Sequence, residues 1–249
     1  MSPVGRVLRW EGCHNVRDLG GLETASGGRT RHAGVVRADN VRGLTEAGWA
    51  SALAHGVRHV VDLRHGDEGT GDAAAHPEVG IVSVPLRDQD AEAARAFDER
   101  MLAADDIAPV FAAAYVGMLE TYAPRFAAAA TAVADAPAAD CVVVHCFAGK
   151  DRTGLVAALI LSLADVPDAV VADDYAASDP GVHVLSTPWF AASVDAEQLE
   201  LRRRICRTPR EAMLETLAWV RERGGAEAYL RDAGLSAAGV EALCGRLVG

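Results

Sequence analysis

The sequence predicts an α/β fold, because short apolar segments rich in β-branched residues alternate with longer helical segments. The segments VRHVVDLR (57–64) and CVVVHC (141–146) have the character of buried strands. CVVVHC is followed closely by RTGLVAALILSLADV (152–166), a helical segment with almost no polar face. The short loop between them, FAGKD (147–151), therefore joins a buried strand to a buried helix.

The first part of the chain predicts small elements before the α/β pattern begins. Residues 1–44 are rich in Gly and Arg and contain only short apolar runs, which is typical of small strands and turns. Thr45 can cap a helix that runs through Ala54, and Gly56 can close it. The segment GIVSVPL (80–86) predicts the next strand.

A long helical region is expected between Asp90 and Ala136, where the sequence is rich in alanine. Pro124 is expected to kink or end a helix there. One helix face is expected to be buried, because six large apolar residues share it: Phe111, Tyr115, Met118, Leu119, Tyr122 and Phe126.

The last third of the chain is also expected to be helical. The segment TPREAMLETLAWVRER (208–223) predicts a helix start with Thr208 as the cap, Pro209 at the first helical position and Glu211 three residues after the cap. The sequence contains no internal repeat, low-complexity linker or break in composition. We therefore expect a single domain over residues 1–249.

Composition excludes several classes of protein. The chain has 249 residues, half of them apolar, which is enough to bury a full core. Its net charge is −11, and no basic run is longer than Arg202–Arg204. A protein that binds nucleic acid needs a broad positive face, so we expect no nucleic-acid partner. Any site for an anion must therefore be local.

Cysteine usage and the N-terminus indicate a reducing compartment. The five cysteines are an odd number without ligand-like pairing, so the sequence suggests neither a disulfide framework nor a zinc site. The N-terminal segment MSPVGRVLRWEG has no apolar signal core, and GLVAALILSLADV (154–166) is too short to span a bilayer. We expect a cytoplasmic protein without stable membrane insertion, with non-conventional secretion left open.

The loop FAGKD and its flanks have the features of an anion site. A turn from a strand into a helix can aim several backbone N–H groups at one point, and the helix N-terminus adds about half a positive charge there. Cys146 stands at the start of this loop, where these groups favour the thiolate over the thiol. We therefore expect Cys146 to be a nucleophile at neutral pH.

Arg152 and its neighbours complete the predicted anion site. The planar guanidinium of Arg152 can bind two phosphate oxygens at once, a geometry that lysine cannot supply. Thr153 can donate a hydrogen bond to the sulfur and help it leave in a second step. Gly149 and Gly154 permit turn dihedral angles and close approach.

Lys150 is the only lysine among 24 basic residues, and it falls inside this loop. A single lysine placed at random would lie between Cys146 and Arg152 with a chance of 5/249. We therefore interpret Lys150 as a second, more flexible cationic contact to the substrate. The alternative is an incidental surface lysine.

The loop and three other segments carry a family resemblance. HCFAGKDRTG (145–154) matches the His-Cys-x5-Arg-Thr signature of cysteine-dependent phosphatases. Its Lys-Asp pair resembles the atypical bacterial tyrosine and lipid phosphatases typified by mycobacterial protein tyrosine phosphatase B. The segments NVRDLGGL (15–22), VVDLRHGDE (60–68) and DDYAASD (173–179) are similar to other motifs of that family, in the expected order.

The resemblance implies a phosphatase fold with a central, mostly parallel sheet flanked by helices. It implies a two-step reaction through a cysteinyl-phosphate, with Cys146 and Arg152 as catalytic residues and no metal or other cofactor. His145 and Gly154 would support the loop, His145 by hydrogen bonding. The implied phosphate-binding residues are Phe147, Ala148, Gly149, Lys150, Asp151, Arg152 and Thr153.

The general acid has two candidate sources. The loop aspartate of the resembled family has been considered for this role, so Asp151 is the first candidate and counts among the catalytic residues. Beside a phosphate dianion its carboxyl group would tend to keep a proton. Alternatively, Asp151 points outward and fixes the loop. The rival acids are Asp88 and Asp90 in VPLRDQD (84–90), where a conventional mobile acid loop would lie, although this segment also fits a solvated turn.

The resemblance also implies the substrates. Members hydrolyse phosphotyrosine, some also phosphoserine or phosphothreonine, and several act on phosphoinositides, so we expect a phosphorylated protein or a phosphoinositide as partner. The basic run LRRRICR (201–207) could meet a phosphoinositide headgroup, cover the active site as part of a helical lid, or form a solvated helix face.

Three other functions remain open beside a tyrosine phosphatase. The chain could be a lipid phosphatase that prefers phosphoinositides. A phosphate-binding module without activity could use the same loop, but Cys146, Arg152 and Thr153 are all present. A sulfur-transfer or arsenate-reducing enzyme would form a persulfide or use a resolving cysteine, and the His-Cys-x5-Arg-Thr pattern favours the phosphatase.

Overall fold

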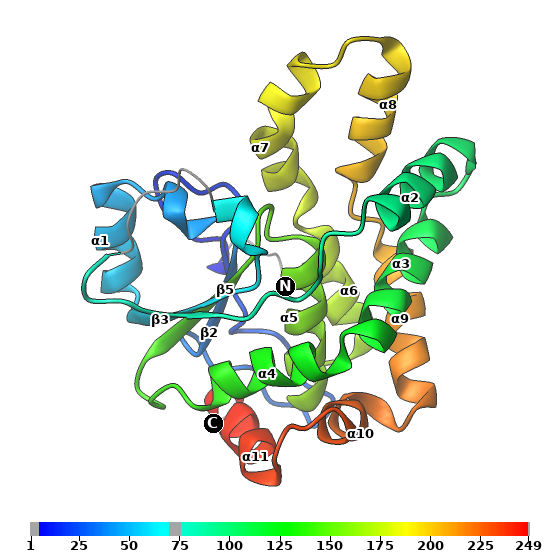
Figure 1. The fold of residues 1–249 in the computed structure, drawn as a ribbon. Helices are drawn as coiled ribbons and strands as arrows, with labels where there is room; N and C mark the ends of the chain where they lie inside the picture. Colours follow the sequence, from blue (N-terminus) through cyan, green and yellow to red (C-terminus); the bar gives the residue numbers. More distant parts are fainter. Residues whose placement is uncertain (1–4, 70–75, 249) are drawn as a thin grey trace.

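The fold is built around one twisted sheet (Figure 1). The structure is a computed structural model that describes residues 5–69 and 76–248. Within these residues the sheet has five strands in the order β1-β2-β5-β3-β4. The strands are β1 Arg17–Asp18, β2 Val35–Ala38, β3 Val57–Asp62, β4 Gly80–Ser83 and β5 Cys141–His145. All neighbouring pairs are parallel except β1 and β2, which confirms the predicted α/β fold with a mostly parallel sheet.

Helices cover both faces of this sheet (Figure 1). One face packs against α1, and the other packs against a larger group that includes α4, α5 and the C-terminal helices. The helices are α1 Glu46–Ala54, α2 Ala91–Ala103, α3 Ala108–Thr121, α4 Ala123–Ala134, α5 Asp151–Leu163, α6 Asp168–Ala176, α7 Asp179–Ala191, α8 Ala196–Ile205, α9 Arg210–Glu222, α10 Gly225–Asp232 and α11 Ala237–Leu247.

Strand β5 is the centre of the sheet and places the loop that follows it. Its side chains alternate, so Cys141 and Val143 pack in the cluster on the α1 side while Val142 and Val144 pack in the larger cluster. His145 at its carboxyl end pairs with Ala38 of β2 and with Asp62 of β3. The loop after β5 therefore emerges between two other strand ends, the usual ligand position in sheets of this kind.

Two local predictions about helix ends are confirmed. The side chain of Thr45 accepts a hydrogen bond from the Gly48 N–H and caps α1, and Gly56 has a φ of +98° after the helix. Helix α3 ends at Thr121, and α4 begins at Ala123 with Pro124 in its first turn. Pro124 therefore marks a new helix, because its ring suits the first turn but not the interior.

The predicted start of the helix at Thr208 is wrong. Helix α9 begins at Arg210 with Pro209 as its N-cap residue, and no side chain caps it. The Thr208 hydroxyl instead donates to Ala176 O at 3.0 Å, at the end of α6. This tertiary hydrogen bond takes the hydroxyl away from the helix end that it was expected to cap.

Helices α7 and α8 form a hairpin that projects from the body of the molecule (Figure 1). Arg202 lies 5.0 Å from the Trp189 ring centroid and joins the two helices. Arg204 donates to the carbonyl oxygens of Met101 and Ala104 at 2.5 and 2.7 Å and ties α8 to α2. Part of the basic run 201–207 therefore holds helices together. Among the described helices, none has the length and apolar character needed to cross a bilayer.

Candidate active site

The candidate site lies where β5 passes into α5. Cys146 directly follows β5 and is 3 % exposed. Helix α5 begins five residues later at Asp151, so the N–H groups of its first turn are not used inside the helix. The loop 146–150 therefore lies at a helix N-terminus, which favours a bound anion.

Surrounding residues bind the outward-facing carbonyl groups of the loop. Phe147 O accepts from the Asn40 N–H at 3.0 Å, Ala148 O from Asn15 Nδ2 at 2.9 Å, and Gly149 O from Arg37 Nη2 at 2.8 Å. Each peptide plane carries its N–H opposite its carbonyl oxygen. With the carbonyl oxygens held outside, the loop can turn its N–H groups toward a shared centre.

Two glycines allow the close packing of this loop. Gly149 has a φ of +66°, and a Cβ atom at this position would lie 2.4 Å from Ala38 O. Only glycine fits both the dihedral angle and the space. Gly154 lies in α5, where a Cβ atom would come within 3.1 Å of the Tyr175 ring. The two glycines therefore bring the loop against β2 and α5 against α6.

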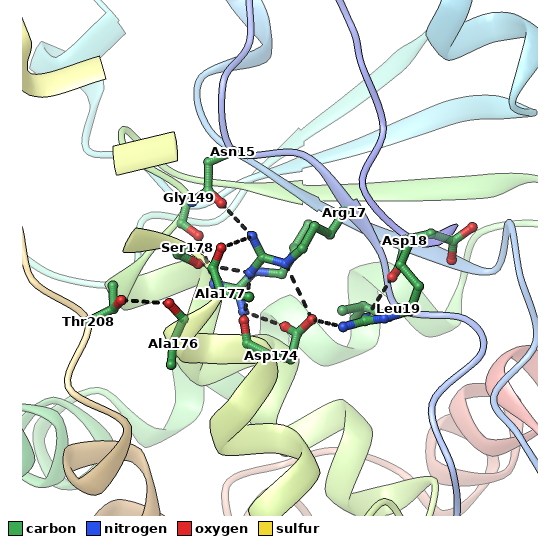
Figure 2. A network of polar contacts seen from close by, with 12 residues as sticks. Asn15, Arg17, Asp18, Leu19, Gly149, Asp174, Ala176, Ala177, Ser178 and Thr208 are labelled. Atoms are coloured by element: carbon green, nitrogen blue, oxygen red, sulfur yellow. Dashed lines mark hydrogen bonds and ion pairs between the residues drawn. The ribbon is translucent and has the colours of Figure 1, made fainter. Parts of the chain in front are cut away.

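A buried network of arginines supports the loop from behind (Figure 2). Arg37 Nη1 donates to Asp174 Oδ2 at 2.7 Å, while its Nη2 donates to Gly149 O at 2.8 Å. The carboxylate of Asp174 also accepts from Arg6 Nη2 at 2.8 Å and from Arg17 Nε at 3.4 Å. All four side chains are nearly inaccessible. One carboxylate therefore organises three guanidinium groups next to the loop 146–150.

The charges in this network keep Asp174 ionised. Burial raises the pKa of Asp174, but the charges of Arg17, Arg37 and Arg6 outweigh it and hold the pKa well below its usual value. Burial lowers the pKa of Arg17 to about 10, so its guanidinium is still charged at neutral pH. Sequence reasoning did not single out Arg37 or Asp174. The signals were an arginine inside the apolar strand VVRA and the DDYAASD segment.

Arg152 forms a two-pronged ion pair with Glu68. Its Nη1 and Nη2 atoms lie 2.5 and 2.6 Å from the two carboxylate oxygens of Glu68, which stands in the short helical turn Gly66–Gly69. Burial raises the pKa of Glu68, but Arg152 outweighs this effect and lowers it. Sequence analysis did not predict this pair. The guanidinium is therefore oriented by a carboxylate that engages one edge of it.

Lys150 is fixed by three internal contacts. Its Nζ atom donates to Ile205 O at the end of α8 at 2.7 Å and lies 3.0 Å from Asp151 Oδ1. It also lies 4.3 Å from the centroid of the Phe111 ring. The residue is 2 % exposed. The structure therefore shows a held ammonium group where the sequence suggested a flexible one, because residues distant in the sequence enclose it.

Asp151 faces a cavity of about 930 Å³. Its side chain is 39 % exposed, and its Oδ1 atom accepts a hydrogen bond from the Tyr115 hydroxyl at 2.5 Å. Burial raises the pKa of Asp151, but the Lys150 charge and the Tyr115 hydrogen bond outweigh it and lower the pKa. Lys150 and Arg152 line the same cavity, as do Phe97 and Phe111. The carboxyl group thus faces the same cavity as two cationic side chains and two aromatic rings.

The rival acids also line this cavity but have other partners. Asp90 caps α2 by accepting from the N–H groups of Glu92 and Ala93 at 3.0 and 2.9 Å. Asp88 lies 2.8 Å from Arg125, and this pairing lowers the pKa of its exposed carboxyl group. Neither residue is in the loop 146–150 or the first turn of α5.

His145 and Thr153 lie on either side of the loop in the sequence and occupy supporting positions. His145 Nδ1 lies 3.0 Å from Cys146 O, and burial lowers the pKa of His145 to about 4 although Asp62 opposes this. The ring is therefore neutral at pH 7. Thr153 Oγ1 is buried and has no hydrogen-bond partner within the described parts of the chain. A buried, unbonded hydroxyl is costly, so this atom is available to a group that binds in the loop.

Comparisons with known proteins agree with these features. The model of the tyrosine phosphatase family matches residues 8–249. The chain is 27 % identical to the triple specificity protein phosphatase PtpB of Mycobacterium tuberculosis, over 98 % of this chain and 99 % of PtpB. It is 30 % identical to a tyrosine-protein phosphatase of Nostoc commune, over 57 % of this chain and 47 % of that protein. It is also 30 % identical to a putative tyrosine-protein phosphatase of Cupriavidus necator, over 69 % of this chain and 63 % of that protein.

The family match covers nearly the whole chain and includes the strand, loop and helix that form the candidate site. The predicted family is thus confirmed, and so is the prediction of a phosphatase enzyme. The chain belongs to the tyrosine phosphatase family.

Proposed function

We propose that the chain hydrolyses phosphomonoesters in two steps through a cysteinyl-phosphate on Cys146. The observation that carries this proposal is the loop itself, whose carbonyl groups are bound from outside while Cys146 and Arg152 stand at its two ends. Such a cradle fits a phosphate with a nucleophile beneath it.

In the first step the Cys146 thiolate attacks phosphorus. A bond forms between Sγ and phosphorus, and the bond from phosphorus to the leaving oxygen breaks. Arg152 and the loop N–H groups bind the three phosphoryl oxygens, whose charge rearranges in the transition state. The charge of the bound phosphate dianion raises the pKa of Asp151 again, so its carboxyl group holds a proton. It gives this proton to the leaving oxygen, and the product leaves as an alcohol or phenol.

In the second step water attacks the phosphoryl group on Cys146. Asp151, now a carboxylate, takes a proton from this water as its oxygen bonds to phosphorus. The sulfur–phosphorus bond breaks, and inorganic phosphate leaves. The unbonded Thr153 hydroxyl can donate to the departing thiolate and stabilise its charge.

We infer that phosphotyrosine is a substrate, with phosphoserine, phosphothreonine and phosphoinositides as further candidates. The cavity beside the loop is lined by the rings of Phe97, Phe111 and Tyr115, which suit an aryl group. The triple specificity named for PtpB supports the wider range, since the two chains align over nearly their full lengths.

The substitution Cys146→Ser tests the mechanism. A serine hydroxyl stays protonated where the thiolate would form, so turnover of an aryl phosphate should be lost while inorganic phosphate still binds. Cys244→Ser is a matched control, because Cys244 lies on α11 and its thiol donates a hydrogen bond to Leu163 O at 3.3 Å. Full activity of Cys146→Ser, activity that a chelator abolishes, or persulfide formation in place of phosphate release would overturn the proposal.

A further inference from the structure

The two carboxylate oxygens of Asp151 have different surroundings. Oδ1 accepts a hydrogen bond from the Tyr115 hydroxyl at 2.5 Å and lies 3.0 Å from Lys150 Nζ. Over residues 5–69 and 76–248, no side chain or backbone group makes a hydrogen bond with Oδ2. One oxygen is therefore held by two donors, and the other is left to the cavity.

The donor on Oδ1 belongs to a pair of buried tyrosines. The hydroxyl groups of Tyr115 on α3 and Tyr175 on α6 are 2.6 Å apart, and their rings meet edge to face. Both residues are at most 2 % exposed. The Tyr175 ring is also fixed against α5, because the missing side chain of Gly154 leaves just enough room for it. Two separate helices thus direct hydroxyl groups toward one carboxylate.

The direction of these hydrogen bonds follows from the groups themselves. An ionised carboxylate can only accept, so Tyr115 donates to Asp151. The Tyr115 oxygen then accepts from the Tyr175 hydroxyl. The order is Tyr175 to Tyr115 to Asp151, and within the described residues it satisfies both buried hydroxyl groups. Buried tyrosine hydroxyls need such partners, and phenylalanine would otherwise suit these apolar positions.

Charged and titratable groups face Asp151 from several elements. Lys150 and Arg152 flank it at the start of α5, Tyr115 faces it from α3, and Tyr175 stands behind Tyr115 on α6. Cys206, at the end of α8, is the fifth such group. Burial raises the pKa of Asp151, but Lys150 and Tyr115 together lower it. Tyr115 is thus the neutral donor among groups that favour the ionised carboxylate.

We propose that Tyr115 and Tyr175 are positioning residues for proton transfer: they hold Asp151 Oδ1 so that Oδ2 carries the proton to the leaving group. This inference rests on the proposed role of Asp151 as general acid. The proton moves from Oδ2 to the leaving oxygen as the phosphorus–oxygen bond breaks. Both tyrosines keep their protons, and their hydrogen bonds strengthen as the carboxylate forms. In the second step Oδ2 accepts the proton of the attacking water.

The substitution Tyr115→Phe removes the hydroxyl and keeps the ring. Without this donor the ionised form of Asp151 is less stable, so its pKa rises. A general acid works only while protonated, so the descending high-pH limb of the kcat profile should move to higher pH. The carboxyl group is also held less well, and we expect kcat on phosphotyrosine to fall about tenfold, with a smaller loss on nitrophenyl phosphate.

A double-substitution cycle tests the order of the two tyrosines. Tyr175→Phe alone should move the same limb in the same direction by a smaller amount, because Tyr115 still donates directly. In Tyr115→Phe the further change Tyr175→Phe should have no effect on the limb, because the link to Asp151 is already gone. Tyr229→Phe is the matched control. It removes another tyrosine hydroxyl that donates to α3, at Leu119 O, and it should leave the limb in place.

The measurements are kcat against pH on phosphotyrosine and on nitrophenyl phosphate, with thermal unfolding of each variant. A limb that does not move in Tyr115→Phe, with equal losses on both substrates, would overturn the positioning role and reduce it to packing. An equal shift of the high-pH limb in Tyr229→Phe would also overturn the positioning role. Asp151→Asn, measured in parallel, separates a failure of the tyrosine proposal from a failure of the proposed general acid. If it shows no loss that depends on the leaving group, the acid assignment itself fails, and the tyrosine proposal is overturned with it.

Discussion

Arg37 donates to Asp174 at 2.7 Å with one nitrogen and to the Gly149 carbonyl oxygen in the loop after β5 with another, at 2.8 Å. The strand β2, the helix α6 and the loop are thereby joined through one buried guanidinium group. Removing the carboxylate would leave three buried arginines with too little compensating charge.

Asp174→Asn is therefore expected to lower the free energy of unfolding by about 3 kcal/mol or more. Asp173→Asn is the control at the neighbouring position, because Asp173 is 65 % exposed and pairs with Arg210 at the surface. That change should cost less than about 1 kcal/mol. Urea denaturation at pH 7 measures both values. Similar losses in the two variants would show that the buried network adds no more than a surface pair.

The carboxylate of Asp174 also determines how the free energy of unfolding depends on pH. The three arginines hold the pKa of Asp174 below its usual value although burial raises it. The contribution of Asp174 to the free energy of unfolding is therefore complete above the pKa of an aspartate in the unfolded chain, about 4. It is lost as the pH falls through the lower pKa of Asp174 in the folded state. The stability difference between the unsubstituted protein and Asp174→Asn should stay constant from pH 7 to about 5 and shrink in stronger acid. A difference that shrinks above pH 5 would contradict this assignment.

Gly149→Ala tests the close approach of the loop to β2. An alanine Cβ atom would lie 2.4 Å from Ala38 O, and its φ of +66° would be strained as well. Gly27→Ala is the control for strain alone, because Gly27 has a φ of +87° with no atom within 4 Å of the added Cβ. We expect about 100-fold loss of kcat/KM in Gly149→Ala, because the loop must shift, and little change in Gly27→Ala. Equal activity in both variants would show that the loop accommodates the methyl group.

The strand, loop and helix of the site could be predicted from the sequence because their signals are local. The run CVVVH, the glycines and the apolar segment after Arg152 lie within about 25 consecutive positions, so propensity and spacing decide their structure. The support of the loop could not be predicted in this way. Arg37 and Asp174 are 137 residues apart, and Glu68 and Arg152 are 84 apart. Such pairs form because the sheet order places their elements together, which a single sequence does not state.

Lys150 shows how the structure changes a prediction. The sequence predicts a flexible cationic contact to the substrate at Lys150, but its ammonium group is bound to Ile205 O and Asp151. We now expect Lys150→Ala to lower kcat/KM by about tenfold or more on an aryl phosphate and on a phosphoinositide alike. Arg203→Ala removes an exposed positive charge from α8 and serves as the control. A loss in Lys150→Ala confined to the phosphoinositide would contradict this expectation and support a flexible contact that acts only on the more highly charged substrate.

The general acid is the residue whose assignment most affects the mechanism, and three aspartates compete for it. Asp151 begins α5 directly beside Arg152 and lines the cavity, whereas Asp90 caps α2 and Asp88 pairs with Arg125. A general acid is typically worth about 10²- to 10⁴-fold in rate, and the need for it grows as the leaving group becomes a poorer anion. The dependence of the loss on the leaving group therefore distinguishes a proton donor from a residue that shapes the loop.

Asp151→Asn should lose far more activity on phosphotyrosine than on nitrophenyl phosphate, and the descending high-pH limb of its kcat profile should disappear. Asp88→Asn and Asp90→Asn should show neither effect. Because Asp90 caps α2, thermal unfolding of Asp90→Asn shows whether that change alters stability instead. A uniform loss across leaving groups in Asp151→Asn would mean that the carboxylate only holds Lys150 and Tyr115 in place. A selective loss in Asp88→Asn would assign the proton to the segment before α2, because only the residue that protonates the leaving oxygen becomes more important as that oxygen becomes more basic.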